Sequence, residues 1–394
     1  MSRAFLCWIL SSAFLFFAAN SMAQLDMSTG ATAKLQVLYV VGNTNIATYN
    51  VDPQTFNLTQ VGDLAVNNPT YYYNLAPSPN GRFVYFVADD AQYRRHLWVY
   101  ATNSLGAPQT PAVQTMMMPG LFSLEFDPRG NFAYAVKWVR TGKLNDVYFT
   151  IRYQVSAVTG QLTAPAIQAR YELPSGAGGS EFCGPALDGF NKAGTKMYDE
   201  VNCSNHEGDG TVYYERSVDT QTGALGPDVQ IYGWANDTGG GERIQFVGDL
   251  MFDFVLPNDY QQNVSFVDIY PLVPNTTGPV LQCTAQMLAA CGFGSFSGVA
   301  HPSGKYIFLP TMSGGTEVDR VELARREIVA SDNAIPYGIR QFSPDGAVAY
   351  AEQESWSGYT VEVYGFNVAR GTLTVGGSVG PLTYSQSYFI AERR

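Results

Sequence analysis

The sequence carries little charge, and it has no long apolar run after its first two dozen residues. Only 14% of the 394 residues are charged, and 34 acidic residues outnumber 23 basic ones, which gives a formal net charge of −11. Such a chain lacks the basic surface that binds nucleic acid or an anionic membrane, so we expect neither partner. No later stretch approaches the ~18 consecutive apolar residues that a membrane-spanning helix needs, so we expect no membrane span in the mature chain.

The first 23 residues, by contrast, have the pattern of a secretory signal peptide. Arg3 precedes the apolar stretch AFLCWILSSAFLFFAAN, and Ser21 and Ala23 then stand at the small-residue positions that a signal peptidase recognises. An uncleaved N-terminal helix is the alternative, but the apolar core is short. We therefore predict a signal peptide at 1–23, a short tail at 24–34, one folded domain at 35–394, and a periplasmic or extracellular location.

Cleavage removes Cys7 and leaves four cysteines, an even number that indicates disulfides in an exported chain. Three pairings are possible, and proximity in the sequence favours Cys183–Cys203 and Cys283–Cys291. A zinc site is the alternative, but the chain has no CxxC pair, and only His206 lies near these cysteines. Disulfides are the better interpretation.

A short motif recurs along the chain: an apolar residue, a turn that contains Gly and usually Pro, and then alternating apolar and small or polar residues. Pro fixes one backbone angle of the turn and Gly supplies a positive one, so each copy predicts a tight hairpin. Six copies are present: PSPNGRFVYFV (77–87), FDPRGNFAYAV (126–136), FNKAGTKMYDEV (190–201), FVGDLMFDFV (246–255), HPSGKYIFL (301–309) and FSPDGAVAY (342–350). A strand–turn–strand segment follows each one. A seventh such segment has only LQVLYVV (35–41) before it, and SQSYFIAE (385–392) supplies the missing strand from the other end of the chain.

These units have a constant period. The turn glycines Gly81 and Gly346 stand five repeats apart, a mean spacing of 53 residues, and seven such units fill the 371 residues that remain after cleavage. Four-stranded units repeated in this way are typical of a β-propeller, with three N-terminal strands and the C-terminal strand sharing one blade. A β-sandwich or several small β domains would not show a fixed period. The predicted fold class is all-β, a seven-bladed propeller of four-stranded antiparallel blades, and we expect a monomer.

In such a propeller the Pro/Gly turns lie on one face, and the irregular loops lie on the other. Variable loops on a rigid scaffold commonly carry function, so we expect a site at the mouth of the central channel on the second face. Trp138, Trp234 and Trp356 fall in predicted loops of that face. Their rings suit stacking on a sugar, and the alternative is that they pack over the blade ends.

The loop 202–210 brings Asn202, His206, Glu207 and Asp209 close together in the sequence. These groups suit acid–base chemistry or a metal ion, but their spacing does not match an EF-hand loop, and a solvated surface loop is the alternative. His301 stands at a turn position equivalent to Ser343 in another repeat, so we interpret it as a turn residue. We expect no cofactor, and a structural or catalytic divalent cation in the channel stays open.

The apolar-Pro-x-Gly turns, such as FSPDGAVAY and HPSGKYIFL, and the strand pairs VTGQLT and QTGAL resemble repeats of the seven-bladed lactonase-like propellers. That family contains bacterial 6-phosphogluconolactonase and the YVTN-repeat proteins. The likeness spans the mature chain and implies a propeller with a lactone-opening site at its channel. It specifies the fold better than the activity, because one propeller fold hosts unrelated functions.

The sequence departs from the family at the positions that flank each turn. Many repeats of the family carry a His seven residues before the turn glycine and an Asn-Glu pair seven and eight residues after it. Here none of the upstream positions holds His; they hold Asn74, Ser123, Leu187, Ser297 and Ile339. Of the downstream positions, Asp89, Asn202 and Glu354 keep polar character.

Two functional hypotheses follow. The first is an exported module that binds an unknown small molecule, sugar or protein through its loop-rich face; the ligand-binding candidates are Asn74, Lys137, Trp138, Asn202, His206, Trp234 and Trp356. The alternative is a lactonase-like hydrolase that opens a sugar-type lactone at the channel mouth. Lactone opening needs a general base near neutral pH, and Asp89 or Glu354 would supply it without a His partner.

Overall fold

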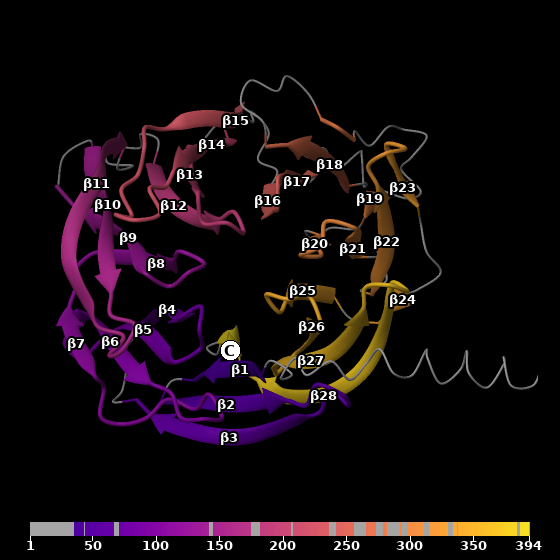
Figure 1. Ribbon diagram of the computed structural model, residues 1–394, viewed down its shortest axis with the longest axis horizontal. Coiled ribbons are helices and arrows are strands. Elements are labelled where there is room, and N and C mark those ends of the chain that lie inside the picture. Colours follow the sequence, from indigo (N-terminus) through magenta and orange to yellow (C-terminus); the bar gives the residue numbers. More distant parts are fainter. Residues whose placement is uncertain are drawn as a thin grey trace, which may run out of the picture. The chain divides into compact units, whose positions relative to one another are not determined.

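Each Pro/Gly turn joins two strands whose small and apolar residues alternate, and each such hairpin forms the inner half of a four-stranded antiparallel sheet. In the computed structural model, seven of these sheets stand around a common centre (Figure 1). The structure describes residues 35–42, 44–66, 71–141, 145–174, 182–205, 208–235, 242–255, 265–272, 279–281, 292–293, 298–310, 315–329, 334–336, 338–383 and 387–393. Within these ranges the chain is all-β, and the predicted seven-bladed propeller is confirmed.

The blades follow one another along the chain, and in each the strands run in order from the centre of the ring to its rim. Blade 1 contains β29 (Ser387–Arg393), β1 (Leu35–Val41), β2 (Asn45–Val51) and β3 (Leu58–Ala65). Blade 2 contains β4 (Tyr71–Pro77), β5 (Phe83–Asp89), β6 (Arg95–Ala101) and β7 (Gln114–Met117). Blade 3 contains β8 (Leu121–Phe126), β9 (Phe132–Val139), β10 (Asn145–Val155) and β11 (Leu162–Pro174). Blade 4 contains β12 (Phe182–Phe190), β13 (Lys196–Asn205), β14 (Gly208–Ser217) and β15 (Val229–Ala235).

The remaining blades repeat this order. Blade 5 contains β16 (Glu242–Val247), β17 (Leu250–Val255), β18 (Ser265–Pro271) and β19 (Gly292–Phe293). Blade 6 contains β20 (Val299–Ala300), β21 (Tyr306–Pro310), β22 (Thr316–Glu322) and β23 (Glu327–Val329), and the short β24 (Ala334–Ile335) also pairs with β22. Blade 7 contains β25 (Gly338–Phe342), β26 (Val348–Ser355), β27 (Gly358–Asn367) and β28 (Thr372–Leu382).

The two ends of the described chain close the ring, as the repeat count predicted. Strand β29 pairs antiparallel with β1 from Leu35–Arg393 to Val41–Ser387. A second contact lies further out, where the backbone N–H of Gly377 in blade 7 donates to the carbonyl of Phe56 in blade 1 at 2.9 Å. The sheet that contains both ends therefore has the same partners as the other blades, and no inner edge is left open.

The Pro/Gly turns fasten neighbouring blades together. In FSPDG the hydroxyl of Ser343 accepts from the N–H of Val348 at 3.0 Å, and Gly346 has a φ of 75°, which only glycine adopts without strain. His301, from the turn of the preceding blade, is 2% exposed, and its Nε2 donates to the Gly346 carbonyl at 2.9 Å. Its Nδ1 accepts from the N–H of Ser303 at 3.0 Å, and burial lowers the pKa of this imidazole. His301 is thus a buried turn residue that links two blades.

Buried tyrosines of blades 1, 2 and 3 add a further link on the same side. The hydroxyls of Tyr39, Tyr85 and Tyr134 donate to the carbonyls of Gly106, Gly160 and Gly223 in the next blade, at 2.7, 2.5 and 2.7 Å. Apolar side chains fill the spaces between blades; one cluster, for example, joins Leu97 of blade 2 to Leu124 of blade 3. Among the described residues no helix has the length and apolar character to cross a membrane.

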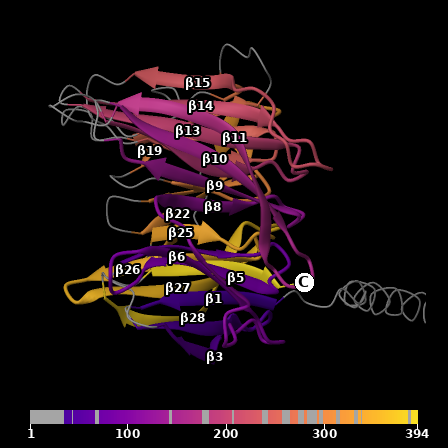
Figure 2. The same ribbon diagram turned by 90° about the vertical axis from the view of Figure 1, so that its left-hand side faces the viewer.

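We call the face with the six Pro/Gly turns the turn face and the opposite face the loop face. Because the strands of a blade alternate in direction, the loop face holds the connections between second and third strands and those between blades. Seen from the side, the blades stack with their strands running from one face to the other (Figure 2).

Candidate functional site in the central channel

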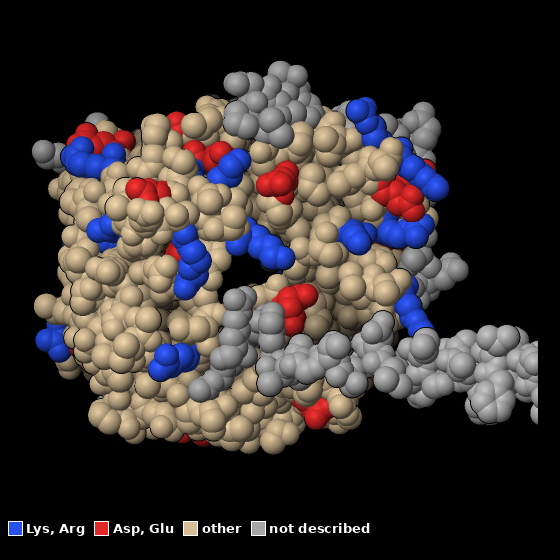
Figure 3. All heavy atoms as spheres, in the orientation of Figure 1, with Lys and Arg blue, Asp and Glu red and all other residues tan. Residues whose placement is uncertain are grey.

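Seven inner strands, one from each blade, surround the centre of the ring. They are the first strands of the blades in spatial order: β29, β4, β8, β12, β16, β20 and β25. The space-filling view shows an opening at this centre, with basic and acidic side chains on its rim and a surface that is otherwise mostly uncharged (Figure 3). The polar residues of the inner strands are therefore the first place to seek a site.

Four inner strands contain a β-bulge, an extra residue that has no partner in the adjacent strand. The extra residues are Tyr73 in β4, Phe122 in β8, Asp188 in β12 and Arg340 in β25. A bulge bends its strand and re-aims the side chain beside it, which is why bulges are frequent near active sites. Asp188 and Arg340 both stand six residues before the turn glycine of their repeat. Their strands, β12 and β25, lie on opposite sides of the ring (Figure 1).

Three carboxyl groups come together where blade 3 meets blade 4. Glu125 belongs to β8, Asp188 to β12 and Glu200 to β13, and β8 contacts β12. Glu125 and Glu200 are partly buried. Asp188 is exposed to solvent, although nearby protein atoms still reduce the hydration of its carboxyl group. We call Glu125, Asp188 and Glu200 the acidic wall.

Burial raises the pKa of each carboxyl group of the acidic wall. The pKa of Glu125 rises to about 7, because protein replaces the water that would stabilise its charge. The pKa of Asp188 is raised more strongly, first by burial and then by the nearby negative charges of Glu200, Asp199 and Glu125. Burial also raises the pKa of Glu200, while a hydrogen bond donated by the Tyr213 hydroxyl opposes the rise. Near neutral pH the acidic wall therefore holds protonated and ionised carboxyl groups side by side, as acid–base catalysis requires.

The opposite side of the ring carries a carboxylate whose charge is compensated. The Nε of Arg340 donates to Oε2 of Glu352 on β26 at 3.1 Å, with the two side chains 27% and 22% exposed. The hydroxyl of Tyr388 on β29 donates to the same carboxylate, and burial together with the charge of Glu352 raises the pKa of Tyr388. These contacts join the last blade to the C-terminal strand of the first. We call Arg340, Glu352 and Tyr388 the clamp wall.

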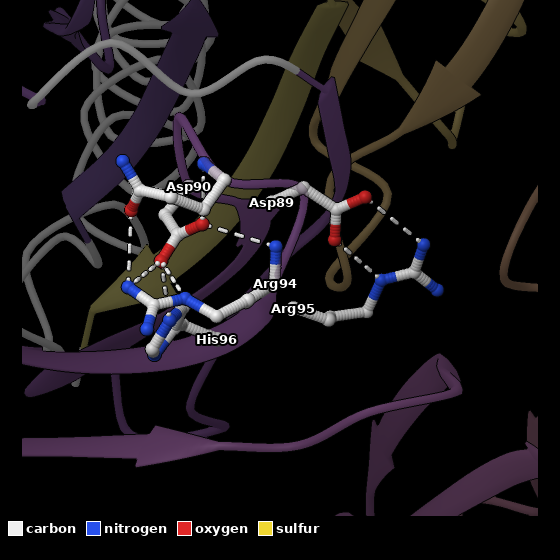
Figure 4. A network of polar contacts seen from close by, with 6 residues as sticks. Asp89, Asp90, Arg94, Arg95 and His96 are labelled. Carbon is white, nitrogen blue, oxygen red and sulfur yellow. Dashed lines mark hydrogen bonds and ion pairs between the residues drawn. The ribbon is translucent and has the colours of Figure 1, made fainter.

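Asp89, a catalytic candidate from the sequence, lies at the end of β5 and is 5% exposed. Its carboxylate accepts from the Nε of Arg95 at 3.0 Å, and the Nη1 of Arg95 also donates to the carbonyl of Leu121 at 2.5 Å. Asp89 and Arg95 point toward each other, away from the second group of charged residues in the same loop (Figure 4). The structure thus places Asp89 in a buried ion pair that ties blade 2 to blade 3.

That second group orders the loop between β5 and β6. The carboxylate of Asp90 accepts from the Nε of Arg94 at 2.9 Å and lies 3.0 Å from the Nε2 of His96 (Figure 4). The hydrogen bond from Arg94 is the main reason why the pKa of Asp90 is well below its usual range. The ring of His96 packs against Trp98, with centroids 5.3 Å apart. A loop that the sequence marked as irregular is therefore held in place by its own polar contacts.

The other described candidates also have packing partners. The Nδ2 of Asn74 donates to the carbonyl of Leu124 at 3.4 Å, which links β4 to β8. Lys137 is partly buried in β9, opposite Leu121 of β8. The indole N–H of Trp138 donates to Asp146 at 2.9 Å, and the ring stacks on Tyr148 with centroids 6.4 Å apart.

The prediction that three tryptophans lie in loops was wrong for two of them. Trp138 belongs to β9 and Trp234 to β15, because both ladders continue further toward the loop face than the sequence pattern indicated. Trp356 does lie in a turn, at the tip of the β26–β27 hairpin, where its side chain is fully exposed. Asn74, Asp89 and Trp138 bond to different partners, Leu124, Arg95 and Asp146.

The remaining candidates cannot be placed by their side chains. Glu354 lies in β26 opposite Tyr359, and Asn202 lies in β13 opposite Gly184, but for these two and Trp234 only the backbone is described. His206, Cys283, Cys291 and the predicted signal peptide and tail at 1–34 fall outside the described residues.

The predicted bond between Cys183 and Cys203 is present and joins β12 to β13. The two residues stand directly opposite each other in the ladder, and Cys183 is 2% exposed. The bond therefore lies on the two strands that carry Asp188 and Glu200, toward their loop-face ends.

The acidic wall itself was not predicted from the sequence, although a signal was available. Glu125 and Asp188 stand five and six residues before the turn glycines of neighbouring repeats, and this spacing places them on inner strands. Within the described part of the chain, no group of three or more His, Cys, Asp or Glu side chains is arranged to hold a metal ion.

Comparison with known proteins supports the fold. The chain aligns with a candidate 6-phosphogluconolactonase from Bacteroides uniformis at 15% identity and a TM-score of 0.54, covering 91% of this chain and 99% of the other. A candidate 6-phosphogluconolactonase from Bacteroides fragilis gives the same identity and TM-score, with 92% and 99% covered. A protein from Lactobacillus plantarum aligns at 13% identity and a TM-score of 0.53, with 90% and 99% covered. No family model and no curated protein matches the chain. At these identities the likeness establishes the fold alone: the chain is a seven-bladed propeller with the architecture of these lactonase-like proteins.

Proposed function

We propose that the protein hydrolyses a sugar-type lactone in its central channel, with Glu125 and Asp188 as the acid–base pair. The observation that carries the proposal is the acidic wall, where two carboxyl groups on adjacent inner strands have raised pKa values, that of Glu125 being about 7. Groups perturbed in this way are favoured in active sites. The lactonase-like fold is consistent with this chemistry, but a fold by itself does not specify a reaction.

The different pKa values assign the roles of the two residues. Glu125 is about half ionised at neutral pH, so its carboxylate takes a proton from water while the oxygen attacks the lactone carbonyl carbon. Asp188 keeps its proton to higher pH, so it donates that proton to the ring oxygen as the acyl C–O bond breaks. The product is the open hydroxy acid. The proton gained by Glu125 then replaces the one lost by Asp188, through water, and one water is consumed.

The test is a panel of sugar lactones assayed with the purified protein between pH 5 and 9. We expect a bell-shaped profile of kcat/KM, because Glu125 must be ionised and Asp188 protonated. Glu125→Gln and Asp188→Asn should each lower kcat by at least ~10²-fold. Glu322→Gln, which alters a carboxylate at the end of β22 that pairs with Arg320 and Arg325, is the matched control and should keep wild-type activity. Turnover that is the same in Glu125→Gln as in the wild type would overturn the proposal.

A second function, ligand binding at the loop face, is favoured by two exposed aromatic residues. Trp356 is fully exposed, and Tyr93, in the β5–β6 loop, is 70% exposed. The tip of the β26–β27 hairpin also extends outward on the loop face, at the left of Figure 2. The same panel separates the two functions: stabilisation by a sugar without turnover, lost in Trp356→Ala, would support binding alone. For either function we propose export, based on the signal-peptide pattern and the disulfide, and cell fractionation tests it.

A further inference from the structure

The turn face carries basic residues on two neighbouring blades, 6 and 7. They lie in the outer turns, which join β22 to β23 and β27 to β28, and beside the Pro/Gly turn of blade 6. Figure 3 shows Lys and Arg side chains, with acidic ones among them, gathered on the right, where Figure 1 places β22 and β23. We define the basic patch by five basic and two aliphatic residues: Lys305, Arg320, Arg325, Arg326, Arg370, Leu323 and Val368.

The two outer turns of the basic patch have matching sequences. They read ELARR in blade 6 and NVARG in blade 7, so each places an aliphatic residue, an Ala and an Arg at its tip. The aliphatic residues, Leu323 and Val368, are 38% and 44% exposed, and the Arg of each tip is exposed as well. At the last position blade 7 has Gly371 with a φ of 67°, whereas blade 6 has Arg326 with a φ of 55°. A residue with a side chain is less stable than Gly at such an angle, so an Arg there points to a use for its charge.

Hydrogen bonds hold the two tips next to each other. The N–H of Val321, one residue before the blade 6 turn, donates to the carbonyl of Lys305 at 2.9 Å. The hydroxyl of Tyr306 donates to the carbonyl of Val368 in the blade 7 turn, also at 2.9 Å. Because Lys305 and Tyr306 are adjacent in the chain, these bonds join one tip to the other. The basic patch is therefore one continuous surface.

Two acidic residues lie within the same turns, and they compensate only part of the charge. Glu322 pairs with Arg320 and Arg325, and Glu327 pairs with Arg325 at 3.4 Å. Five basic residues against two acidic ones leave a formal charge of +3, in a chain whose net charge is −11. Within the described ranges no acidic side chain forms an ion pair with the other three cations, all of them exposed: Lys305, Arg326 and Arg370.

We propose that the basic patch docks the protein on an anionic lipid surface. The net charge of the whole chain predicted no such partner, but that value averages over the molecule. Charges separated by more than about 8 Å are largely screened at physiological ionic strength. A surface that touches the basic patch therefore meets mainly its local positive charge. Docking does not require lactone hydrolysis, so the two proposals are tested separately.

The exposed aliphatic tips favour a lipid surface over a soluble polyanion. Anionic headgroups attract Lys and Arg, and the apolar zone beneath them accepts aliphatic side chains. A soluble polyanion would use the cations alone, and Leu323 and Val368 would stay in water. Both tips lie on the turn face, so a docked protein keeps its loop face, with the exposed Trp356, directed away from the lipid.

The first test is sedimentation with vesicles. The exported protein is used from Gln24 onward, so that the apolar N-terminal stretch does not contribute. It should bind phosphatidylcholine vesicles that contain about one-third phosphatidylglycerol at least ~10-fold more tightly than vesicles of phosphatidylcholine alone. That preference should disappear in about 1 M salt, where the screening length is about 3 Å. Equal binding to both kinds of vesicle in dilute salt would overturn the proposal.

Two pairs of substitutions locate the contact. Arg325→Gln with Arg326→Gln should lower the affinity for the anionic vesicles by at least ~10-fold. Arg140→Gln with Arg170→Gln is the matched control, since it changes the net charge equally at two exposed residues of blade 3. The control should stay within about 2-fold of the wild type, because those charges lie far from the lipid. An equal loss in both would show that only the overall charge matters and would contradict the proposal.

A third pair, Leu323→Ser with Val368→Ser, distinguishes lipid from a soluble polyanion. Without the aliphatic side chains the affinity for anionic vesicles should fall about 5-fold or more. Binding of dextran sulfate, a soluble polyanion, should be the same as in the wild type. If this variant binds vesicles as well as the wild type does, the basic patch is a polyanion site and the lipid proposal is wrong. Urea unfolding checks that every variant is folded.

Discussion

On one side of the channel Asp188 occupies a β-bulge six residues before a turn glycine, and on the other side Arg340 occupies the same position of its repeat. Asp188 stands among carboxyl groups that raise its pKa further. Arg340 stands beside Glu352, which in turn accepts a hydrogen bond from Tyr388. The same β-bulge position therefore holds an acid without an ion-pair partner on the acidic wall and one member of an ion pair on the clamp wall.

The difference indicates which side carries chemistry and which carries structure. A compensated ion pair between the last blade and the C-terminal strand holds the ring closed, and neither charge is available at low cost to a ligand. Neighbouring carboxyl groups that lose hydration and form no ion pair with a cation destabilise the folded protein, and a destabilising arrangement is usually kept only where it serves function. The acidic wall is thus the better candidate site, although both walls come from equivalent parts of a repeat.

The largest expected effect concerns the covalent support of the acidic wall. Replacing Cys183 and Cys203 together by Ser should lower the free energy of unfolding by about 3 kcal/mol, because the bond closes a loop of some 20 residues in the unfolded chain. Urea unfolding of the oxidised double variant measures this loss. The double variant is preferable to adding a reductant, which would also act on the predicted Cys283–Cys291 bond. An unchanged midpoint would mean that the bond does not support this wall.

Glu-to-Gln substitutions on the two walls should change stability in opposite directions. Glu125 has a pKa of about 7 in the folded protein and near 4.5 when unfolded, so between these pH values the folded state holds the extra proton and stability falls as pH rises. Glu125→Gln removes that dependence and should stabilise the protein by about 1–2 kcal/mol at pH 8, with no gain left at pH 4. Glu352→Gln leaves Arg340 without its carboxylate and should destabilise by about 1–2 kcal/mol.

Urea unfolding of both variants and the wild type at pH 4, 6 and 8 checks this pair of expectations. The sign at pH 8 is decisive: a loss of stability in both variants would show that Glu125 makes a favourable contact and that the two walls are alike. Glu322→Gln serves again as control: Glu322 is 21% exposed, about as much as Glu352, but its partners Arg320 and Arg325 are more than half exposed, and solvent weakens such ion pairs.

The fold was predictable because it depends on local signals that repeat. Gly346 needs a positive φ, Ser343 accepts from the N–H of Val348 across the turn, and a similar pattern recurs every 53 residues or so. The closure of the ring followed from counting strands. Neither the turns nor the closure depends on which particular residues meet across blades.

The site was not predictable in the same way, because its properties arise between repeats. Glu125 reads as an ordinary polar position in an alternating strand, and its pKa is raised only when neighbouring blades displace water from it. Asp188 is the extra residue of a β-bulge, which shifts the strand register by one residue. The turn motif in the sequence does not predict this bulge. Asp89, favoured from the sequence for its place after the hairpin, forms an ion pair instead with Arg95, its direct partner in the β5–β6 ladder. The position of a residue within its repeat predicts the strand on which it lies. Its chemical role depends on the charged groups that neighbouring strands and blades place around it.

The smallest expected effect compares two tyrosines that each donate to a carboxylate, Tyr213 to Glu200 and Tyr388 to Glu352. Both Tyr→Phe changes should cost about 1 kcal/mol of stability through the lost hydrogen bond. Only Tyr213→Phe should affect catalysis. Without that donor the pKa of Glu200 rises, so Glu200 carries less charge near neutral pH and repels the ionised form of Asp188 less. The pKa of Asp188 then falls, and the high-pH limb of the lactonase profile moves down by roughly 0.3–0.5 pH unit. A shift of that limb in Tyr388→Phe, or its absence in Tyr213→Phe, would show that the proton donor is not controlled from the acidic wall.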